Sequence, residues 1–249
     1  MRTIQKIHLA ESVPFEGLRT SSPLQSPNTS PIDPFILLNH HGPQFYEPNN
    51  KGLPFGPHPH RGMETVTFII DGDLSHKDST GNDSNIKSGG VQWMTAGSGV
   101  IHAEVSSEEF KRKGGNLEIL QLWLNLPAKL RMAKPFYKGL QRDDIPSVSE
   151  DNEKVLVKII SGEWKNTKGI IESISGVSIF TLEMKAGGKL SLKVPVEHNI
   201  FFYVVKGEVI VNEQNSSEGD LLEFNHNSKD IFIECKNDAI ILFGHAKPF

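Results

Sequence analysis

The chain has 249 residues, of which 37% are hydrophobic and 22% are charged, and its formal net charge is −4. This length allows one large all-β domain or two ordinary domains, each with its own core, and the composition excludes a disordered or fibrous protein. The sequence contains no basic patch that would neutralise nucleic-acid phosphates, which argues against direct nucleic-acid binding; any contact with DNA would need a protein partner.

The cysteine content and the hydropathy bear on the cellular compartment in which we expect the protein. Cys235 is the only cysteine, so no intrachain disulfide can form, and this favours the cytosol or the nucleus. The N-terminus has no apolar signal core, and the longest apolar run, residues 200–205, is far too short to span a bilayer. We therefore expect a cytoplasmic protein without a membrane segment, and we expect a monomer.

The first part of the chain predicts few strands. Residues 1–19 could supply one strand, and the Ser-, Pro-, Thr- and Asn-rich residues 20–34 are typical of a surface loop. Residues 33–38 predict a short buried strand. The Pro-, Gly- and Asn-rich residues 41–57 then predict a mobile rim that leads to a pair of histidines.

From residue 64 onward the sequence alternates between short β-type segments and Gly-rich turns. Residues 65–70 and 91–94 are typical of strands, and turns are predicted at 71–73, near 81–82 and at 89–90. Helical periodicity is weak in this half, and no long segment has apolar residues at three- and four-residue spacing. An all-β sandwich or barrel is the architecture that this pattern predicts.

The second half repeats the first. The segment Phe-Ile-Ile-Asp-Gly-Asp-Leu at 68–74 resembles Tyr-Val-Val-Lys-Gly-Glu-Val at 203–209, and a second glycine turn follows each. The pattern breaks in the Pro-containing residues 127–146, so we predict two domains, 1–132 and 133–249. In the repeat, Lys193 and Pro195 stand where His58 and His60 stand in the first half, so we expect one barrel to carry the chemistry. The other barrel is expected to be filled by side chains that include Phe201, Tyr203 and Phe224.

Two short segments carry the candidate site. Residues two apart in a strand point to the same face, so His58 and His60 would project together, and so would His102 and Glu104. If the two strands lie side by side or face each other in a barrel, three imidazoles and a carboxylate converge. Such a set, with an open position, suits a divalent transition metal.

The carboxylate remains open at this point. Glu64 has the same parity as His60 and could face the metal instead of Glu104. The carboxylate that is not a ligand could orient an imidazole, or pair with Arg61 at the surface. The segment Gln92-Trp93-Met94 could line a pocket, but a packed core strand explains it at least as well.

The other histidines and the cysteine have simpler interpretations. We interpret His76 as a turn residue, although it could contact a ligand, and His198 as structural because it has no companion imidazole at ligand spacing. Cys235 is expected to be a small buried hydrophobe. The remaining histidines also receive a structural interpretation: His8, His40, His41, His226 and His245.

Several motifs together resemble the pirin family of the cupin superfamily. Gly52, His58-Pro59-His60, Glu64 and Gly72 resemble the first cupin signature, with one extra residue before the last glycine. Gly99 and His102 resemble the end of the second cupin signature. The resemblance to pirins is closer still in four segments: Pro57–Gly62, Asp78–Asn82, Gln92–Gly97 and Leu120–Pro127.

The resemblance implies two tandem cupin, jelly-roll-like β-barrel domains with one iron site in the N-terminal barrel. Its ligands would fall on His58, His60, His102 and Glu104, with Glu64 outside the ligand set. Fe(II) is the expected metal, and other divalent transition metals are compatible with these ligand types.

The resemblance implies two functions. The leading one is a quercetin 2,3-dioxygenase that opens a flavonol ring with O2, with Glu104, or Glu64 in its place, as catalytic base. The alternative is a non-catalytic, iron-binding, redox-sensitive transcriptional co-regulator that acts through protein partners. Fold alone does not choose between them.

Two departures from the family pattern affect these expectations. Typical pirins continue beyond a segment like 241–244 with a tail that packs across the domains, whereas this sequence stops at Phe249. Many relatives also carry a basic residue where this sequence has Ser98, so substrate preference does not transfer from the resemblance.

Overall fold

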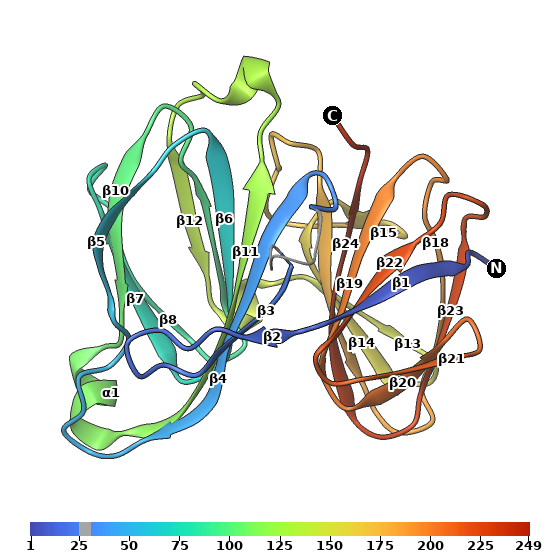
Figure 1. Ribbon diagram of the computed structural model, residues 1–249, viewed down its shortest axis with the longest axis horizontal. Coiled ribbons are helices and arrows are strands. Elements are labelled where there is room, and N and C mark those ends of the chain that lie inside the picture. Colours follow the sequence, from blue (N-terminus) through green and yellow to red (C-terminus); the bar gives the residue numbers. More distant parts are fainter. Residues whose placement is uncertain (25–30) are drawn as a thin grey trace. The chain divides into compact units, whose positions relative to one another are not determined.

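The computed structural model describes residues 1–24 and 31–249, which form two compact β units (Figure 1). The N-terminal unit contains residues 11–24 and Phe35–Asp144, and the C-terminal unit contains Met1–Ala10, residues 31–34 and Ile145–Phe249. The predicted all-β class is confirmed. The division differs from the boundary predicted between residues 132 and 133, because residues 133–144 stay with the first unit and the first ten residues belong to the second.

The N-terminal unit has two antiparallel sheets. The larger has the strand order β12-β9-β6-β11-β4-β3-β2 and the smaller β5-β10-β7-β8. The larger sheet consists of β2 (Glu11–Ser12), β3 (Thr20–Leu24), β4 (Phe35–Tyr46), β6 (Met63–Asp71), β9 (Val91–Thr95), β11 (Gly115–Asn125) and β12 (Phe136–Leu140). The smaller consists of β5 (Phe55–His60), β7 (Asp73–Asp78), β8 (Asp83–Lys87) and β10 (Val100–Val105). The short helices of this unit are α1 (Glu108–Lys113), η1 (Ala128–Leu130) and η2 (Arg142–Asp144).

The C-terminal unit repeats this plan, with sheets β1-β22-β19-β24-β17-β14-β13 and β18-β23-β20-β21 and the ribbon β15-β16. The larger sheet consists of β1 (Ile4–Leu9), β13 (Ser147–Glu150), β14 (Val155–Ser161), β17 (Ser178–Met184), β19 (Asn199–Lys206), β22 (Asp220–Phe224) and β24 (Ala239–Ala246). The others are β15 (Glu163–Trp164), β16 (Thr167–Lys168), β18 (Lys189–Lys193), β20 (Glu208–Val211), β21 (Gln214–Ser217) and β23 (Asp230–Cys235).

The two sheet orders correspond strand by strand, which supports the internal repeat. The order β9-β6-β11-β4 matches β22-β19-β24-β17, and β5-β10-β7-β8 matches β18-β23-β20-β21. The two similar segments, 68–74 and 203–209, both run from a strand of the larger sheet into one of the smaller. Each half of the sequence therefore folds into the same β plan.

The first strand of the chain does not join the N-terminal unit. β1 pairs with β22, and the buried Arg2 donates hydrogen bonds to the carbonyl oxygens of Pro195, His198 and Asn225. In Figure 1 the blue β1 accordingly lies beside the orange β22. A buried guanidinium with several carbonyl acceptors is costly to displace, so this segment is anchored to the C-terminal unit.

Two expectations for residues before the site are wrong. Residues 20–24 form strand β3 where a loop was predicted, while residues 25–30 of that predicted loop lie outside the described residues. β4 runs from Phe35 to Tyr46, well beyond its predicted end, and passes through Gly42. A Cβ on Gly42 would lie 2.3 Å from the carbonyl oxygen of Leu117, and the register with β11 shifts there. The glycine that suggested a loop instead permits an irregular close approach within the sheet.

The prediction of which side chains fill the interior of the C-terminal unit is only partly right. Phe224 packs in the core cluster with Phe202 as expected, but Phe201 and Tyr203 are buried outside that cluster. Side chains alternate between faces along β19, so Phe202 and its two neighbours in sequence point to opposite sides of the sheet.

No helix in the described residues is long and apolar enough to cross a membrane.

His198 contacts a second imidazole that its sequence spacing did not indicate, although the pair is not part of the group of metal-ligating side chains found in the described residues. β19 and β24 pair antiparallel and bring the Nδ1 atoms of His198 and His245 to 3.0 Å, although the two residues are far apart in sequence. Burial, together with the neighbouring His198 and Arg2, lowers the pKa of His245 from 6.5 to about 4.

The pKa of His245 predicts a loss of stability in acid. The pKa of His245 is lower in the folded protein than in the unfolded chain, so the unfolded chain binds the proton first as the pH falls. The contribution of neutral His245 to stability is therefore complete above pH 6.5 and is lost as the pH falls toward 4. We expect His245 to cost about 2 kcal/mol of unfolding free energy between pH 7 and pH 5. Urea unfolding of wild type and His245→Phe at both pH values measures this. Equal pH dependence in the two proteins would contradict it.

Candidate metal centre

Two paired strands of the smaller N-terminal sheet bring three imidazoles together. β5 and β10 run antiparallel with His102 opposite His58 and Val100 opposite His60. The ligand nitrogens of His58, His60 and His102, called here the histidine cluster, all lie within 4.8 Å of one another. The predicted convergence of these side chains is therefore present in the structure.

The electrostatics of the histidine cluster favour neutral imidazoles. Burial and the neighbouring histidines lower the pKa of His102 to about 3 and that of His60 to about 4. Neutral imidazole is the form that binds a metal. His58 is half-buried, and its Nδ1 donates to the carbonyl oxygen of Gly56 at 2.7 Å, so that in the neutral ring Nε2 is the nitrogen with the free lone pair.

The histidine cluster leaves polar atoms that a cation would satisfy. The Nε2 atoms of His58 and His102 are 3.0 Å apart, and the Nε2 of His60 is buried without a hydrogen-bond partner. Buried polar atoms without a partner are rare and costly. A divalent transition ion fits this donor set, because imidazole nitrogen is a common ligand for iron, nickel, copper and zinc.

Glu104 lies near the histidine cluster but outside it. Its Oε1 accepts hydrogen bonds from Thr67, at 3.0 Å, and from Gln92, while its Oε2 accepts one from Gln121 at 2.6 Å. The residue is buried, and burial raises the pKa of its carboxyl even though these three donors oppose the shift. The structure thus brings together three of the four predicted ligands and gives the fourth a different set of contacts.

Glu64 is buried in a separate set of contacts. Its Oε1 accepts hydrogen bonds from the indole of Trp93 at 3.0 Å and from the hydroxyl of Thr95 at 2.7 Å. It is not part of the histidine cluster. Gln92, Trp93 and Met94 are all buried in β9. Gln92 donates a hydrogen bond to Glu104 and Trp93 donates one to Glu64, so these two residues do more than fill a core.

His76 is not the turn residue that we expected. It lies within β7 with its side chain fully buried, and its Nδ1 is 3.4 Å from the Nδ1 of His102. Its Nε2 lies 3.0 Å from the Oδ2 of Asp78. The two-residue spacing of His76 and Asp78 on one strand face was the available signal. No comparable signal existed for Tyr137, whose ring stacks on His76, or for Thr67 and Gln121, which donate to Glu104, because each reaches the site from a strand distant in sequence.

A cavity adjoins the histidine cluster. Its volume is about 620 Å³, and His58 forms part of its wall together with Trp123, whose ring packs edge-on against His60 at 5.2 Å between centroids. The remaining lining combines apolar and aromatic side chains with polar ones: Val13, Phe15, Thr20, Ser22, Leu37, Asn39, His41, Pro54, Phe55, Gly56 and Gln121. An amphipathic cavity of this size beside a candidate metal site is typical of a small-molecule site.

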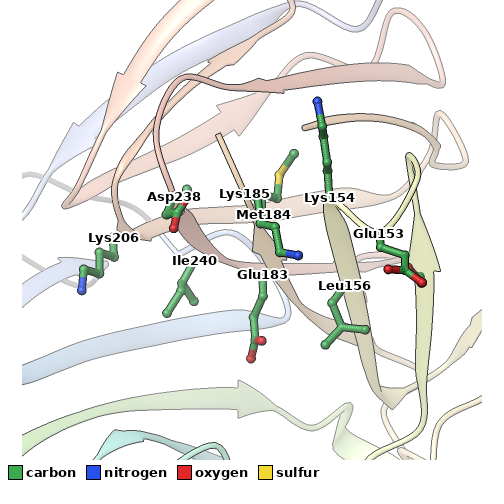
Figure 2. A pocket seen from close by; sticks show the side chains of 11 residues that line it. Glu153, Lys154, Leu156, Glu183, Met184, Lys185, Lys206, Asp238 and Ile240 are labelled. Carbon is green, nitrogen blue, oxygen red and sulfur yellow. The ribbon is translucent and has the colours of Figure 1, made fainter. Parts of the chain in front are cut away.

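The C-terminal unit has a different kind of cavity. Figure 2 shows a hollow of about 460 Å³ whose lining includes Lys154, Glu183, Lys206 and Asp238. Its lining includes carboxylates, but in the described part of the chain the group of three ligand atoms within 4.8 Å of one another is the histidine cluster. The candidate metal chemistry therefore belongs to the N-terminal unit.

Comparisons with known proteins agree with this architecture. Residues 17–124 match the Pirin family model, and residues 165–243 match the model described as quercetinase C-terminal cupin domain. A Pseudomonas aeruginosa protein named "Putative quercetin 2,3-dioxygenase PA2418" is 36% identical over 87% of this chain and 76% of its own length. A pirin-like protein of Caulobacter vibrioides is 36% identical over 93% of this chain and 82% of its own.

Solved structures show the same fold. A crystal structure titled quercetin 2,3-dioxygenase from Acinetobacter baumannii matches with a TM-score of 0.92 and 31% identity, over 100% of this chain and 88% of that one. An Escherichia coli bacterial pirin in complex with nickel(II) matches with a TM-score of 0.78 and 19% identity, over 98% and 99% of the two chains. The second match concerns the fold alone. The two β units of this chain therefore correspond to tandem cupin domains.

Proposed function

The chain belongs to the pirin family, and we propose that it is a metal-dependent dioxygenase of the quercetin 2,3-dioxygenase type. The reaction converts one flavonol and one O2 into one ring-opened ester and one carbon monoxide. The observation that carries the proposal is the convergence of His58, His60 and His102 on one point beside a cavity of about 620 Å³. The names of the Pseudomonas and Acinetobacter proteins support it.

The metal would be held by the three nitrogens of the histidine cluster. Fe(II) is the proposed ion, and Glu104 is the proposed fourth ligand once one of its oxygens leaves a hydrogen-bond donor. When bound, such an ion supplies Lewis acidity and a template for the substrate hydroxyl and O2. Burial lowers the pKa of His60 and of His102, so these two imidazoles are neutral and can bind a metal.

Glu104 is also the proposed base for the flavonol hydroxyl, a role that its carboxylate can take only when it is not bound to the metal. Its carboxyl is buried, and burial raises its pKa, so that it accepts a proton more readily than an exposed glutamate. Gln121 connects this carboxyl to the cavity, because it donates to Glu104 and also lines the cavity wall. Thr67 and Gln92 hold the other carboxylate oxygen in place.

The cavity fits a flat hydroxylated aromatic molecule. Phe15, Phe55 and Trp123 present aromatic surface, and Phe15 and Phe55 stack with centroids 5.8 Å apart. Thr20 and Asn39 add polar atoms on β3 and β4. Apolar walls with a few polar groups bind the ring system and fix its orientation through the hydroxyls.

Aerobic turnover of quercetin tests the proposal. Protein reconstituted with Fe(II) is expected to remove flavonol absorbance and to release carbon monoxide in equal amounts, whereas chelator-treated protein is expected to do neither. Anaerobic incubation with the loaded protein is the second control, because O2 is a substrate. Full metal loading without loss of any flavonol tested would contradict the proposal.

A further inference from the structure

We propose that Asp78 and His76 form a positioning relay that holds the imidazole of His102 with its Nε2 lone pair directed at the metal. The inference rests on the histidine cluster being the metal site, but it does not depend on the reaction catalysed there. Its first support is continuity: the Asp78 carboxylate, the His76 ring and the His102 ring make successive contacts across the paired strands β7 and β10. The side chains of Asp78 and His76 are 1% and 0% exposed.

The contacts of Asp78 fix the proton on His76. The Oδ1 of Asp78 accepts from the backbone N–H and the hydroxyl of Thr80 and from the backbone N–H of Asn82. Its Oδ2 accepts from the side-chain amide of Asn82 and lies 3.0 Å from the Nε2 of His76. An ionised carboxylate only accepts hydrogen bonds, so His76 must carry its proton on Nε2.

The proton on His76 in turn fixes the tautomer of His102. With Nε2 protonated, the neutral His76 ring has an acceptor at Nδ1, and the facing Nδ1 of His102 at 3.4 Å is the donor. In the relay the proton of His102 is therefore on Nδ1 and its lone pair is on Nε2, whereas the opposite tautomer would donate from Nε2 to the Nε2 of His58 at 3.0 Å. A neutral His58 likewise has its lone pair on Nε2, because its Nδ1 donates to the carbonyl oxygen of Gly56. Two lone pairs facing each other are satisfied by a cation that both can bind.

Stacking also fixes the plane of the His76 ring. Tyr137 stacks on His76 with the centroids 4.0 Å apart and an interplanar angle of 13°. Its hydroxyl donates to the Oε1 of Gln92 at 3.1 Å, so the amide nitrogen of Gln92 faces Glu104. The same tyrosine thus supports the positioning of His102 and the orientation of the amide that donates to Glu104. Partners beyond the ligands are known to tune metal sites in this way.

Asp78→Asn is the sharpest test. An amide at this position puts an N–H₂ group against the Nε2–H of His76, so His76 is expected to move its proton to Nδ1 and His102 to move its own to Nε2. Ring ¹⁵N NMR of the metal-free protein reads these tautomers directly. We expect His102 to be protonated on Nδ1 in wild type and on Nε2 in the variant. A wild-type His102 protonated on Nε2 would overturn the relay.

Zn(II) affinity supplies the second readout, measured by competition with a chromophoric chelator. We expect His76→Leu and Asp78→Asn to weaken Zn(II) binding by about 10- to 100-fold. His76→Gln should recover most of that loss, because its amide oxygen can accept from the Nδ1–H of His102. Lys77→Met is the matched control, since Lys77 lies between the two residues on β7 with a side chain 78% exposed.

The outcomes separate positioning from packing. A packing role for His76 predicts that Gln and Leu weaken Zn(II) binding equally and that Asp78→Asn changes no tautomer, and either result overturns the proposal. If His76→Leu fails to fold, the comparison of Asp78→Asn with wild type still decides it. Normal tautomers and metal binding without quercetin turnover would instead contradict the proposed function and leave the relay intact.

Discussion

Replacing His102 by alanine is expected to abolish metal binding and, with it, quercetin turnover. His102 contacts both other members of the histidine cluster: its Nε2 lies 3.0 Å from that of His58, and its ring centroid lies 5.0 Å from that of His60. Loss of a residue that only orients a ligand costs about 10- to 100-fold in affinity, so loss of a ligand should cost more than about 100-fold. Two neighbouring imidazoles alone would not compensate.

The measurement is metal content after reconstitution, together with turnover under air. His226→Ala is a control, because His226 is an exposed histidine of the C-terminal unit. It should retain one metal per chain and wild-type turnover. His102→Ala protein that is folded by circular dichroism and still holds one tightly bound metal would show that the histidine cluster is not the site.

Local strand geometry accounts for what could be predicted at the site. The alternation of side chains on β5 and β10 places His58 with His60 and His102 with Glu104, and this requires only two residues of spacing. Repetition of a β-type segment likewise predicted two similar units, because each copy has the turns and apolar runs of the same strand order. These features depend on residues close together in the chain.

The features that were missed depend on contacts between distant segments. His76 meets His102 because β7 pairs with β10, and His198 meets His245 because β19 pairs with β24. Sequence spacing contains no information about which strands become neighbours, so both histidines looked isolated. The strand β4 was cut short for a related reason: the Pro-, Gly- and Asn-rich composition of residues 41–57 predicted a mobile rim, whereas Gly42 permits a close approach to β11.

The contacts of Glu104 also depend on segments that are distant in sequence. Its parity with His102 was sufficient to predict its face, but the three donors that hold it come from β6, β9 and β11: Thr67, Gln92 and Gln121. Whether a carboxylate faces an ion or a set of amides depends on these neighbours. Glu64, which has the same parity as His60, is instead held by Trp93 and Thr95.

The comparison of Glu104→Gln with Glu64→Gln is expected to separate the two candidate bases. We expect Glu104→Gln to lower kcat/KM for quercetin by about 10²- to 10⁴-fold, because an amide cannot take the proton of the flavonol hydroxyl. Glu64→Gln should have a much smaller effect. Its amide oxygen can still accept from Trp93 and Thr95, and the side chain lies outside the histidine cluster.

The pH profile and metal content distinguish a base from a ligand. Burial raises the pKa of Glu104, so its base form is lost as the pH falls through that raised pKa, and wild-type kcat/KM should decline on the acid side. Glu104→Gln protein that keeps one metal per chain and lacks this acid limb identifies Glu104 as the base, whereas loss of the metal identifies it as a ligand. A larger loss of kcat/KM in Glu64→Gln than in Glu104→Gln would reverse the assignment and place the proton transfer at Glu64.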